Sequence, residues 1–506
     1  MSSKIAFLSP SGRSLSMRPP LAYLSLSAFL EENGIGSDIV ESKGFSAKKS
    51  LEKSFEKLHR LKPEIIGLTC LTTEVLEARA VAQRLHKEFP ESTLIVGGVH
   101  PTLRPQDLIF ENNGIDYAVM GEGEETSLEL VQKILANDVS GKTMGKVQGI
   151  AFLNGKKLEI TEKRPLIKDL SVLPSPNYGK IDMDFYTKPD IYCIRGVPIS
   201  GFYFFTSRGC PFACQFCVNK NLFGRTIRYK DPVKVVEDIE AVVKKNGIDG
   251  FYFYDDTFTV NRKHVEKICS ELKERKLDLI WGCETRVNLV YKDLMVAMKK
   301  AGCVQIDFGV ESGSEINLKR LQKGITVPEI KNGFKICKEV GIRTFANFML
   351  NTPDETEQDV EETIQLAREL NANVSIFNVT TPFPGTEIYD RLGGVPLEDY
   401  ETLGPNPTSF NVWLSMIETK YKLSEHKMPL GTLLERLNKE FPSIHSLSFG
   451  NPKHLARFLN NMAFLFKPSY IAKLLKSKHR KQYLDFLLHV SDYLKAQKNL
   501  EESEDQ

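Results

Sequence analysis

"FYFFTSRGCPFACQFC", residues 202–217, joins a strand-like run of aromatic residues to three closely spaced cysteines. Cys210, Cys214 and Cys217 follow a C-x₃-C-x₂-C spacing. Closed zinc sites and electron-transfer clusters usually take four protein ligands. Three thiolates leave one coordination position open, which is the arrangement that a catalytic metal site keeps for a substrate or cosubstrate.

The second half of the chain repeats the pattern of a strand followed by a helix. Helical segments at 232–247, 263–276 and 327–341 are among those that separate the strands. The predicted strands are 202–207, 250–256, 279–286, 304–312, 343–350 and 374–383. Six such units predict an open, partial β/α barrel, whose chemistry lies at the carboxyl ends of the strands. The three cysteines follow the first of these strands.

The first half alternates in a similar way and predicts a doubly wound parallel sheet, whose ligands lie beyond the carboxyl ends of its strands. Helical patterns such as 22–34 and 74–89 separate the strand-like runs 4–10, 37–42, 64–71, 93–102 and 116–126. The alternative is that the glycines serve only turns and helix caps, and that the histidine only holds a loop. Small or polar residues at these strand ends are Thr69, Thr72, Thr73, Gly97, Gly98, His100, Gly121, Glu122 and Gly123.

We therefore predict four segments in this α/β chain. They are a doubly wound, Rossmann-like domain at 1–145, a proline-containing connector with a short hairpin at 146–195, the partial barrel at 196–395, and a helical region at 396–506. The helical region is locally basic and ends in the acidic run 501–506. A basic amphipathic helix suits contact with a membrane or an apolar anionic ligand, but a packing helix or solvated lid explains the same pattern.

The composition indicates a globular protein of a reducing compartment. The 506 residues are 41% hydrophobic and 26% charged, with a net charge of +2, so nothing points to nucleic acid. The nine cysteines form one tight cluster and six singles, not a paired framework. The N-terminus lacks the apolar core of a signal peptide, and no run has the ~20 apolar residues of a membrane span. We expect a cytoplasmic protein.

The cysteine motif, placed after a barrel strand, resembles that of the radical S-adenosyl-L-methionine (SAM) enzymes. In that family the three cysteines hold a [4Fe-4S] cluster, and SAM occupies the open iron position. The resemblance implies that Cys210, Cys214 and Cys217 are metal ligands and that cleavage of SAM yields a 5′-deoxyadenosyl radical. "IVGGVHPTLRP" (95–105) and "DYAVMGEGEET" (116–126) are similar to the cobalamin-binding domain of one branch of this family.

The resemblance also implies roles for polar residues at further strand ends of the barrel. By analogy with the family they bind the carboxylate, amino group or ribose of SAM, whereas the alternative is ordinary strand-end polarity. These residues are Asp255, Asp256, Glu284, Arg286, Glu311 and Ser312.

The function implied by this resemblance is a cobalamin-dependent radical SAM methyltransferase that acts on an unactivated carbon of a small-molecule or lipid-like substrate. It needs an external electron donor of the flavodoxin or ferredoxin type. One alternative is a cyclase or ring-rearranging enzyme with the same cofactors and no methyl transfer. A third, from another class, is a cobalamin or SAM sensor without turnover. No sequence motif indicates the identity of the substrate or the oligomeric state.

Overall fold

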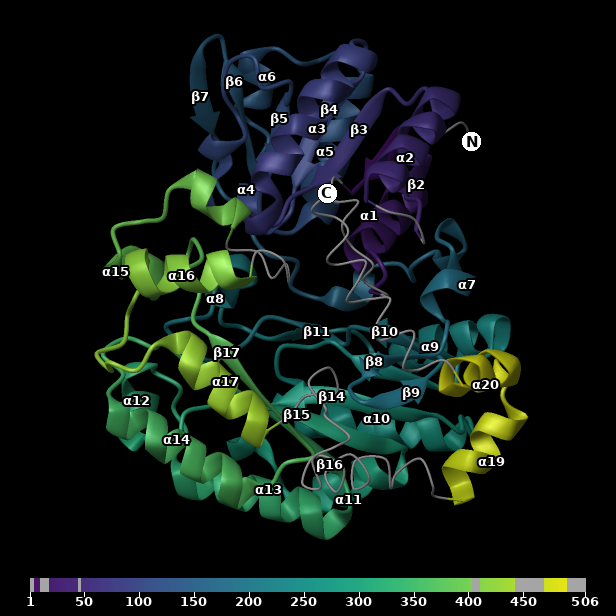
Figure 1. Ribbon diagram of the computed structural model, residues 1–506. Coiled ribbons are helices and arrows are strands. Elements are labelled where there is room, and N and C mark those ends of the chain that lie inside the picture. The colour runs from purple at the N-terminus through teal and green to yellow at the C-terminus, as the bar shows by residue number, and fades with distance from the viewer. Residues whose placement is uncertain (1–3, 10–17, 44–46, 403–409, 442–467, 489–506) are drawn as a thin grey trace.

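The computed structural model contains two large, mainly parallel sheets, one above the other (Figure 1). It describes residues 4–9, 18–43, 47–402, 410–441 and 468–488. The predicted acidic end at 501–506 lies outside these residues. Among the described residues, no helix has the length and apolar character to cross a bilayer.

The first sheet is built from seven of the described strands in the order β2-β1-β3-β4-β5-β6-β7. Strands β1 to β5 pair in parallel, as the alternating pattern predicts. The strands are β1 (Ile5–Leu8), β2 (Ser37–Val40), β3 (Ile65–Thr69), β4 (Thr93–Gly97), β5 (Tyr117–Val119), β6 (Ile150–Asn154) and β7 (Lys157–Ile160). The helices of this unit are α1 (Leu21–Glu32), α2 (Ala47–Leu61), α3 (Val75–Glu88), α4 (Val99–Leu103), α5 (Gly123–Leu135) and α6 (Gly141–Met144).

Both faces of this sheet are covered because alternate strand residues are apolar on each side. Phe55 of α2 and Leu85 of α3 pack with Leu68 on one face. Leu30 of α1 and Leu130 of α5 pack on the opposite face. Two covered faces are the expected environment of a parallel sheet.

The hairpin that we assigned to the connector is instead the edge of the first sheet. Strand β6 pairs antiparallel with β5, and β7 pairs antiparallel with β6. An uncovered β5 would present free backbone groups, and the hairpin satisfies them. The predicted domain boundaries at 145, 195 and 395 stay predictions.

The second sheet has six of the described strands, all parallel, in the order β10-β13-β14-β15-β16-β17. This chain-order arrangement confirms the partial barrel. The strands are β10 (Gly201–Phe204), β13 (Gly250–Phe253), β14 (Ile280–Thr285), β15 (Cys303–Glu311), β16 (Arg343–Leu350) and β17 (Val374–Val379). The helices around them are α9 (Pro232–Asn246), α10 (Arg262–Glu274), α11 (Lys292–Lys300), α12 (Glu315–Arg320), α13 (Val327–Val340), α14 (Glu357–Leu370) and α15 (Glu387–Arg391).

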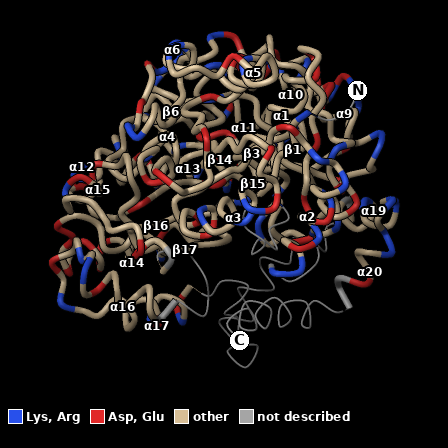
Figure 2. Tube along the Cα trace, turned by 90° about the horizontal axis from the view of Figure 1, so that it is seen from above, with Lys and Arg blue, Asp and Glu red and all other residues tan. Residues whose placement is uncertain are grey.

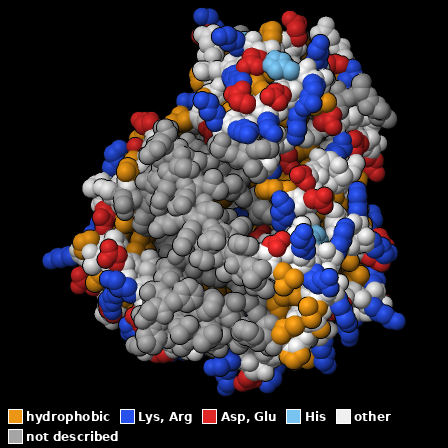
Figure 3. Space-filling view, turned by 45° about the vertical axis from the view of Figure 1, so that its right-hand side comes forward, with side chains coloured by type: hydrophobic (Ala, Val, Ile, Leu, Met, Phe, Trp, Pro, Cys, Tyr) orange, Lys and Arg blue, Asp and Glu red, His pale blue; other side chains and the backbone are white. Residues whose placement is uncertain are grey.

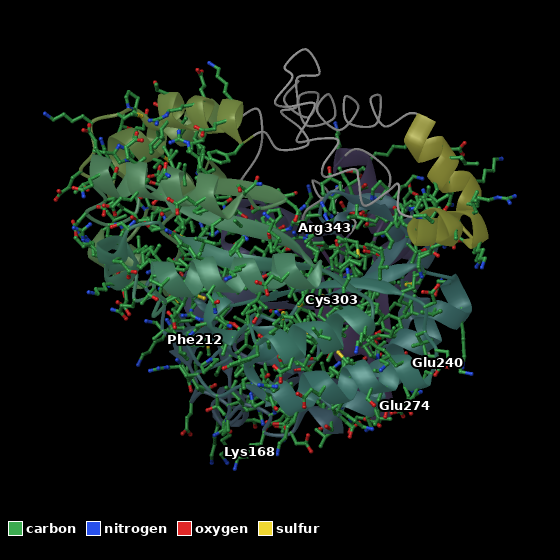
Figure 4. The ribbon with its side chains drawn as sticks, turned by 90° about the horizontal axis from the view of Figure 1, so that it is seen from below. Lys168, Phe212, Glu240, Glu274, Cys303 and Arg343 are labelled. Carbon is green, nitrogen blue, oxygen red and sulfur yellow. The ribbon has the colours of Figure 1, made fainter. Side chains whose placement is uncertain are left out.

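Short elements complete the barrel. A hairpin of β8 and β9 packs with Tyr203 and Tyr252 of the barrel strands. Seen from below, Cys303 and Arg343 lie near the middle of the barrel, Phe212 to their left, and Glu240 and Glu274 to the right on α9 and α10 (Figure 4). The short elements are α7 (Met183–Tyr186), β8 (Asp190–Ile194), β9 (Val197–Ile199), β11 (Ser207–Arg208), α8 (Asn219–Leu222) and β12 (Arg228–Tyr229).

The described part of the C-terminal region is helical, as predicted. It comprises α16 (Phe410–Lys420), α17 (Leu430–Glu440), α19 (Pro468–Lys476) and α20 (Arg480–Leu488). Tyr470 and Tyr483 anchor the last two helices, because the Tyr470 hydroxyl donates to the Pro198 carbonyl and that of Tyr483 to Asp249.

Exposed apolar and basic side chains meet on α19 and α20. Ile471, Leu475 and Leu484 remain exposed, and hydrophobic side chains gather beside Lys and Arg at the lower right of Figure 3. Elsewhere Lys and Arg are interspersed with Asp and Glu (Figure 2).

Candidate active site

The three cysteines lie on a loop whose ends are tied together by a short antiparallel ladder. Strand β11 pairs with β12, so that Ser207 faces Tyr229 and Arg208 faces Arg228. Gly209 begins the loop with φ 94°, and a Cβ atom there would lie 2.6 Å from the Thr226 carbonyl oxygen. The close approach of two backbones therefore requires glycine at this position.

The cysteine loop gathers three free thiols beyond the carboxyl end of β10. Cys214 is buried, while Cys210 and Cys217 are half-buried. Burial raises the pKa of Cys217, and the neighbouring Cys214 and Cys210 raise it further. Thiolates that repel one another in a partly buried loop are stabilised by a metal cation, so this donor set fits an iron–sulfur cluster. Among the described residues, no three His, Cys, Asp or Glu side chains are arranged to hold a single ion.

Arg286 and Glu311, predicted as SAM ligands, lie against the cysteine loop. The Arg286 guanidinium carbon is 3.7 Å from the centre of the Phe212 ring, and its Nη1 is 3.6 Å from the Cys214 sulfur. Glu311 forms a buried ion pair with Lys323 at 2.7 Å, and that ammonium group is 5.6 Å from the Phe216 ring. Arg286 therefore places a positive charge beside the cysteine loop, whereas the charge of Lys323 is balanced by Glu311.

One cavity of about 560 Å³ joins the two sheets. Of the predicted cofactor-binding residues, it is lined by Thr69, Gly97, Gly98, Gly121, Glu122, Gly123, Asp255, Asp256 and Glu284. The carboxyl ends of strands from both halves of the chain therefore open into the same space.

The upper part of the cavity extends between the first sheet and helices α1 and α5. Phe7, Gly67 and Ile95 line it from the sheet. A Cβ on Gly67 would lie 2.8 Å from the Phe7 ring, and one on Gly98 would lie 3.0 Å from the Cys70 carbonyl oxygen. A cavity with apolar walls and glycine-lined edges fits a large ligand with a flat apolar group, such as the aromatic base in the nucleotide tail of cobalamin.

The lower part of the cavity presents carboxylates from the barrel. Burial and the neighbouring Asp307 raise the pKa of Glu284 to about 7, against the effect of Arg195. Arg195 lies 3.7 Å from Glu284 and 3.4 Å from Asp307. Burial also raises the pKa of Asp256, another carboxylate of the cavity wall. Carboxylates that line a cavity are suited to accept hydrogen bonds from an amino group or ribose hydroxyls.

Asp255 lines the cavity but mainly braces the cysteine loop. It accepts hydrogen bonds from the Thr206 amide at 3.0 Å and from the Thr206 and Ser207 hydroxyls. Burial raises the pKa of Asp255 to about 6, while these hydrogen bonds oppose the rise. Its oxygens are thus occupied by the strand that leads to Cys210.

Several predicted cofactor residues stand away from the cavity. His100 is fully buried and lies 3.3 Å from the Thr72 hydroxyl and 3.4 Å from Asp107, so it holds its loop as the alternative proposed. Thr72 is its partner, and Thr73 is not among the cavity residues. Ser312 is buried and lies 3.0 Å from the Thr363 hydroxyl, at the start of α12. Cofactor contacts by these four residues stay predictions.

Four charged residues of the cavity wall were missed by the sequence reasoning. Glu124, Arg208, Lys230 and Asp238 line the cavity. Glu124 follows Gly123 in the first turn of α5, and Arg208 stands two residues before Cys210. The closeness of Glu124 and Arg208 to recognised motifs could have identified them as site residues, whereas no sequence signal indicated Lys230 or Asp238.

The chain matches two family models. The radical SAM superfamily model matches residues 204–367, and the B12 binding domain model matches residues 15–131.

Curated relatives extend the match over most of the chain. The uncharacterized methyltransferase PH0819 of Pyrococcus horikoshii is 33% identical over 376 residues, which are 74% of this chain and 78% of that protein. The anaerobic magnesium-protoporphyrin IX monomethyl ester cyclase of Rubrivivax gelatinosus is 29% identical over 473 residues, covering 92% of this chain and 77% of the cyclase.

Solved structures share the fold. TsrM from Kitasatospora setae, a radical SAM methyltransferase with cobalamin and a [4Fe-4S] cluster bound, gives a TM-score of 0.61 at 20% identity over 78% of this chain and 79% of TsrM. OxsB with aqua-cobalamin and SAM bound gives 0.63 at 16% identity over 98% of this chain and 75% of OxsB. The chain belongs to the cobalamin-binding radical SAM enzymes, whose cofactors are a [4Fe-4S] cluster, SAM and cobalamin.

Proposed function

We propose that this cobalamin-binding radical SAM enzyme is a C-methyltransferase that acts on an unactivated carbon of a small-molecule or lipid-like substrate. The observation that supports it most directly is the single cavity lined by strand ends of both sheets. A group carried at the first sheet would reach a substrate held over the barrel without leaving that cavity. The relative that is 33% identical bears the name methyltransferase.

In this proposal, residues of the barrel bind the cluster and SAM, and residues of the first sheet bind cobalamin. We propose that Cys210, Cys214 and Cys217 hold the cluster, and that Asp256 and Glu284 accept hydrogen bonds from SAM. The glycine-lined part of the cavity would hold cobalamin by shape. When bound, the cluster would supply the electron that cleaves SAM, and cobalamin would carry the methyl group to the substrate carbon. The apolar walls of the cavity exclude water, which protects a reactive radical from side reactions.

We further propose a flavodoxin or ferredoxin as electron donor and the cytoplasm as location. All nine cysteines are free thiols, and a reducing compartment preserves that state.

The proposal is tested without knowledge of the substrate. Protein purified without oxygen is rebuilt with its cluster, loaded with cobalamin, and given a reductant and SAM with a deuterated methyl group. We expect labelled methyl on cobalamin, together with S-adenosylhomocysteine, in mass spectra. Cobalamin that binds but stays unlabelled, while 5′-deoxyadenosine forms, would overturn methyl transfer.

A cyclase is the second candidate, and one observation favours it. The cyclase of Rubrivivax gelatinosus matches 92% of this chain, whereas the methyltransferase relative matches 74%. The match therefore includes part of the C-terminal region, where a substrate would be selected. The outcome with unlabelled cobalamin would move this candidate to first place.

A further inference from the structure

Four charged residues connect the cysteine loop to the first sheet. We name Glu122, Glu124, Arg208 and Arg228 the stem clamp. The two glutamates begin α5 of the upper unit, at the end of the turn after β5. The two arginines face each other in the β11–β12 ladder that closes the cysteine loop.

The clamp contacts are direct and involve both glutamates. Arg208 donates to Glu122 at 3.0 Å and to the two carboxylate oxygens of Glu124 at 2.6 and 3.2 Å. Arg228 donates to the other oxygen of Glu122 at 2.7 Å. Two arginines and two carboxylates thus form one network, in which each carboxylate oxygen has a donor.

The connector is held by the same network. The Ile167 amide donates to Glu122 at 2.8 Å, and the Ile167 carbonyl accepts from Arg228 at 2.7 Å. Ser25 of α1 donates to Glu124 at 2.8 Å. The stem clamp therefore joins the upper unit, the connector and the base of the cysteine loop.

The network is buried, which makes its geometry demanding. The side chains of Glu122, Glu124 and Arg228 are about 5% exposed. Burial alone would raise the pKa of Glu124, but the charge and hydrogen bonds of Arg208 hold it below its usual value. Buried ion pairs tolerate the loss of one partner poorly, and they define relative position better than they add stability.

From this network we infer that the stem clamp is a set of positioning residues that fixes the cysteine loop against the carboxyl edge of the first sheet. It thereby sets the distance between the cluster site and the cobalamin site. The functional consequence rests on the proposed function, but the positioning itself does not. Glu122, Glu124 and Arg208 also line the cavity, so a shift of the clamp moves both walls of the site together.

Hydrogen exchange on the cluster-loaded protein, without cobalamin, tests the positioning directly. The variants are Arg208→Ala, the conservative Arg208→Lys, and the charge swap Arg208→Glu with Glu124→Arg. The matched control is Arg436→Ala, which breaks an ion pair with Glu361 between α17 and α14, far along the chain from the clamp. In Arg208→Ala we expect amide exchange about 30-fold faster or more. The change should appear together in the first turn of α5, around Ile167 and in the β11–β12 ladder.

A second readout separates positioning from the cluster itself. Iron content in Arg208→Ala should stay within about threefold of the unaltered protein, because the cysteines are untouched. Transfer of the methyl group from SAM to bound cobalamin should fall about 30-fold or more, and the charge swap should recover part of both losses.

Each outcome bears on the inference. Faster exchange confined to the β11–β12 ladder, or equal exchange in Arg208→Ala and Arg436→Ala, would overturn the clamp as a positioning device. If the unaltered protein transfers no methyl group at all, the proposed function fails, while the exchange data still decide the clamp. A variant that loses iron as well as exchange protection points to a role confined to the cluster loop, and so counts against the inference.

Discussion

Strand ends of both large sheets line the same cavity, but they contribute different kinds of residue. The first sheet contributes glycines such as Gly97, Gly98 and Gly121, and the two cavity glutamates beside it, Glu122 and Glu124, are paired with arginines. The barrel contributes charged and aromatic side chains, such as Tyr254, Asp256 and Glu284. In both sheets a parallel strand is followed by a turn and a helix at the cavity. The fold alone therefore does not explain why the two sheet edges differ.

The difference teaches what each edge is built to hold. A glycine edge lets a large ligand approach the backbone closely and recognises it by shape. An edge of carboxylates offers specific hydrogen bonds and titratable charge in a site of restricted solvent access. The four predictions below break or sharpen this contrast, from the largest expected effect to the smallest.

Cys214→Ala should have the largest effect, because it removes one of the three thiolates on the barrel side. We expect loss of most of the cluster iron. The rate of SAM cleavage should fall by about 100-fold or more, since the three ligands act as a unit. Iron analysis, electron paramagnetic resonance and 5′-deoxyadenosine formation measure this. Cys337→Ala is the control, because Cys337 is a fully buried core residue of α13. Unchanged cofactor-dependent function in Cys214→Ala would instead support a sensor.

Gly98→Ala should damage the glycine edge more than Gly121→Ala. Gly98 has φ 108° and ψ −165°, a conformation nearly confined to glycine, and alanine there costs about 1–3 kcal/mol. Its new Cβ would also meet the Thr69 hydroxyl and the Cys70 backbone at 3.0 Å. Gly121 has φ 77° with open space around its Cβ position. Thermal unfolding and cobalamin titration compare the two, and equal losses would contradict the steric argument.

Glu284→Gln should change the pH dependence of stability. The folded chain raises the pKa of Glu284 to about 7, so it binds this proton more tightly than the unfolded chain does. The stability that protonation contributes is present below the ordinary pKa of Glu and is lost as pH rises toward about 7. Melting temperatures from pH 5 to 8 should therefore shift progressively in favour of Glu284→Gln.

Glu361→Gln is the control for this titration. Arg436 holds the pKa of Glu361 below its usual value by a hydrogen bond, so this carboxylate is ionised throughout pH 5–8, and the melting temperature of the variant relative to the unaltered protein should stay constant over that range. Parallel profiles for the Glu284 and Glu361 variants would show that the environment of Glu284 is not as described.

Of these variants, Thr72→Val should have the smallest effect on cobalamin affinity. Thr72 is buried against His100 and lies off the cavity, so we expect about 1 kcal/mol of lost stability from the hydrogen bond. Cobalamin affinity should stay the same. Thr69→Val, on the cavity wall, should weaken cobalamin by up to about tenfold. Calorimetric titration with cobalamin measures the affinity of both variants. Equal losses of affinity would contradict the different positions of the two hydroxyls.

Much of the fold follows from local pattern. The alternation of apolar runs and amphipathic helices predicts the strands of both sheets, because a parallel strand buried on both faces is apolar throughout. The hairpin at 150–160 was misplaced, since strand propensity does not indicate which edge a hairpin will cover. Its pairing with β5 depends on contacts that are formed only in the folded chain.

The candidate site divides in the same way. Residue type and spacing by themselves predicted the three cysteines as a ligand set and located the glycine-bearing turns, because these residues are close together in the sequence. Only the tertiary structure decided that Thr69 lines the cavity while Thr72 supports His100. Only it brought Arg208 to Glu124, 84 residues apart in the chain. Such contacts depend on how the two sheets pack together, and no local sequence pattern records that.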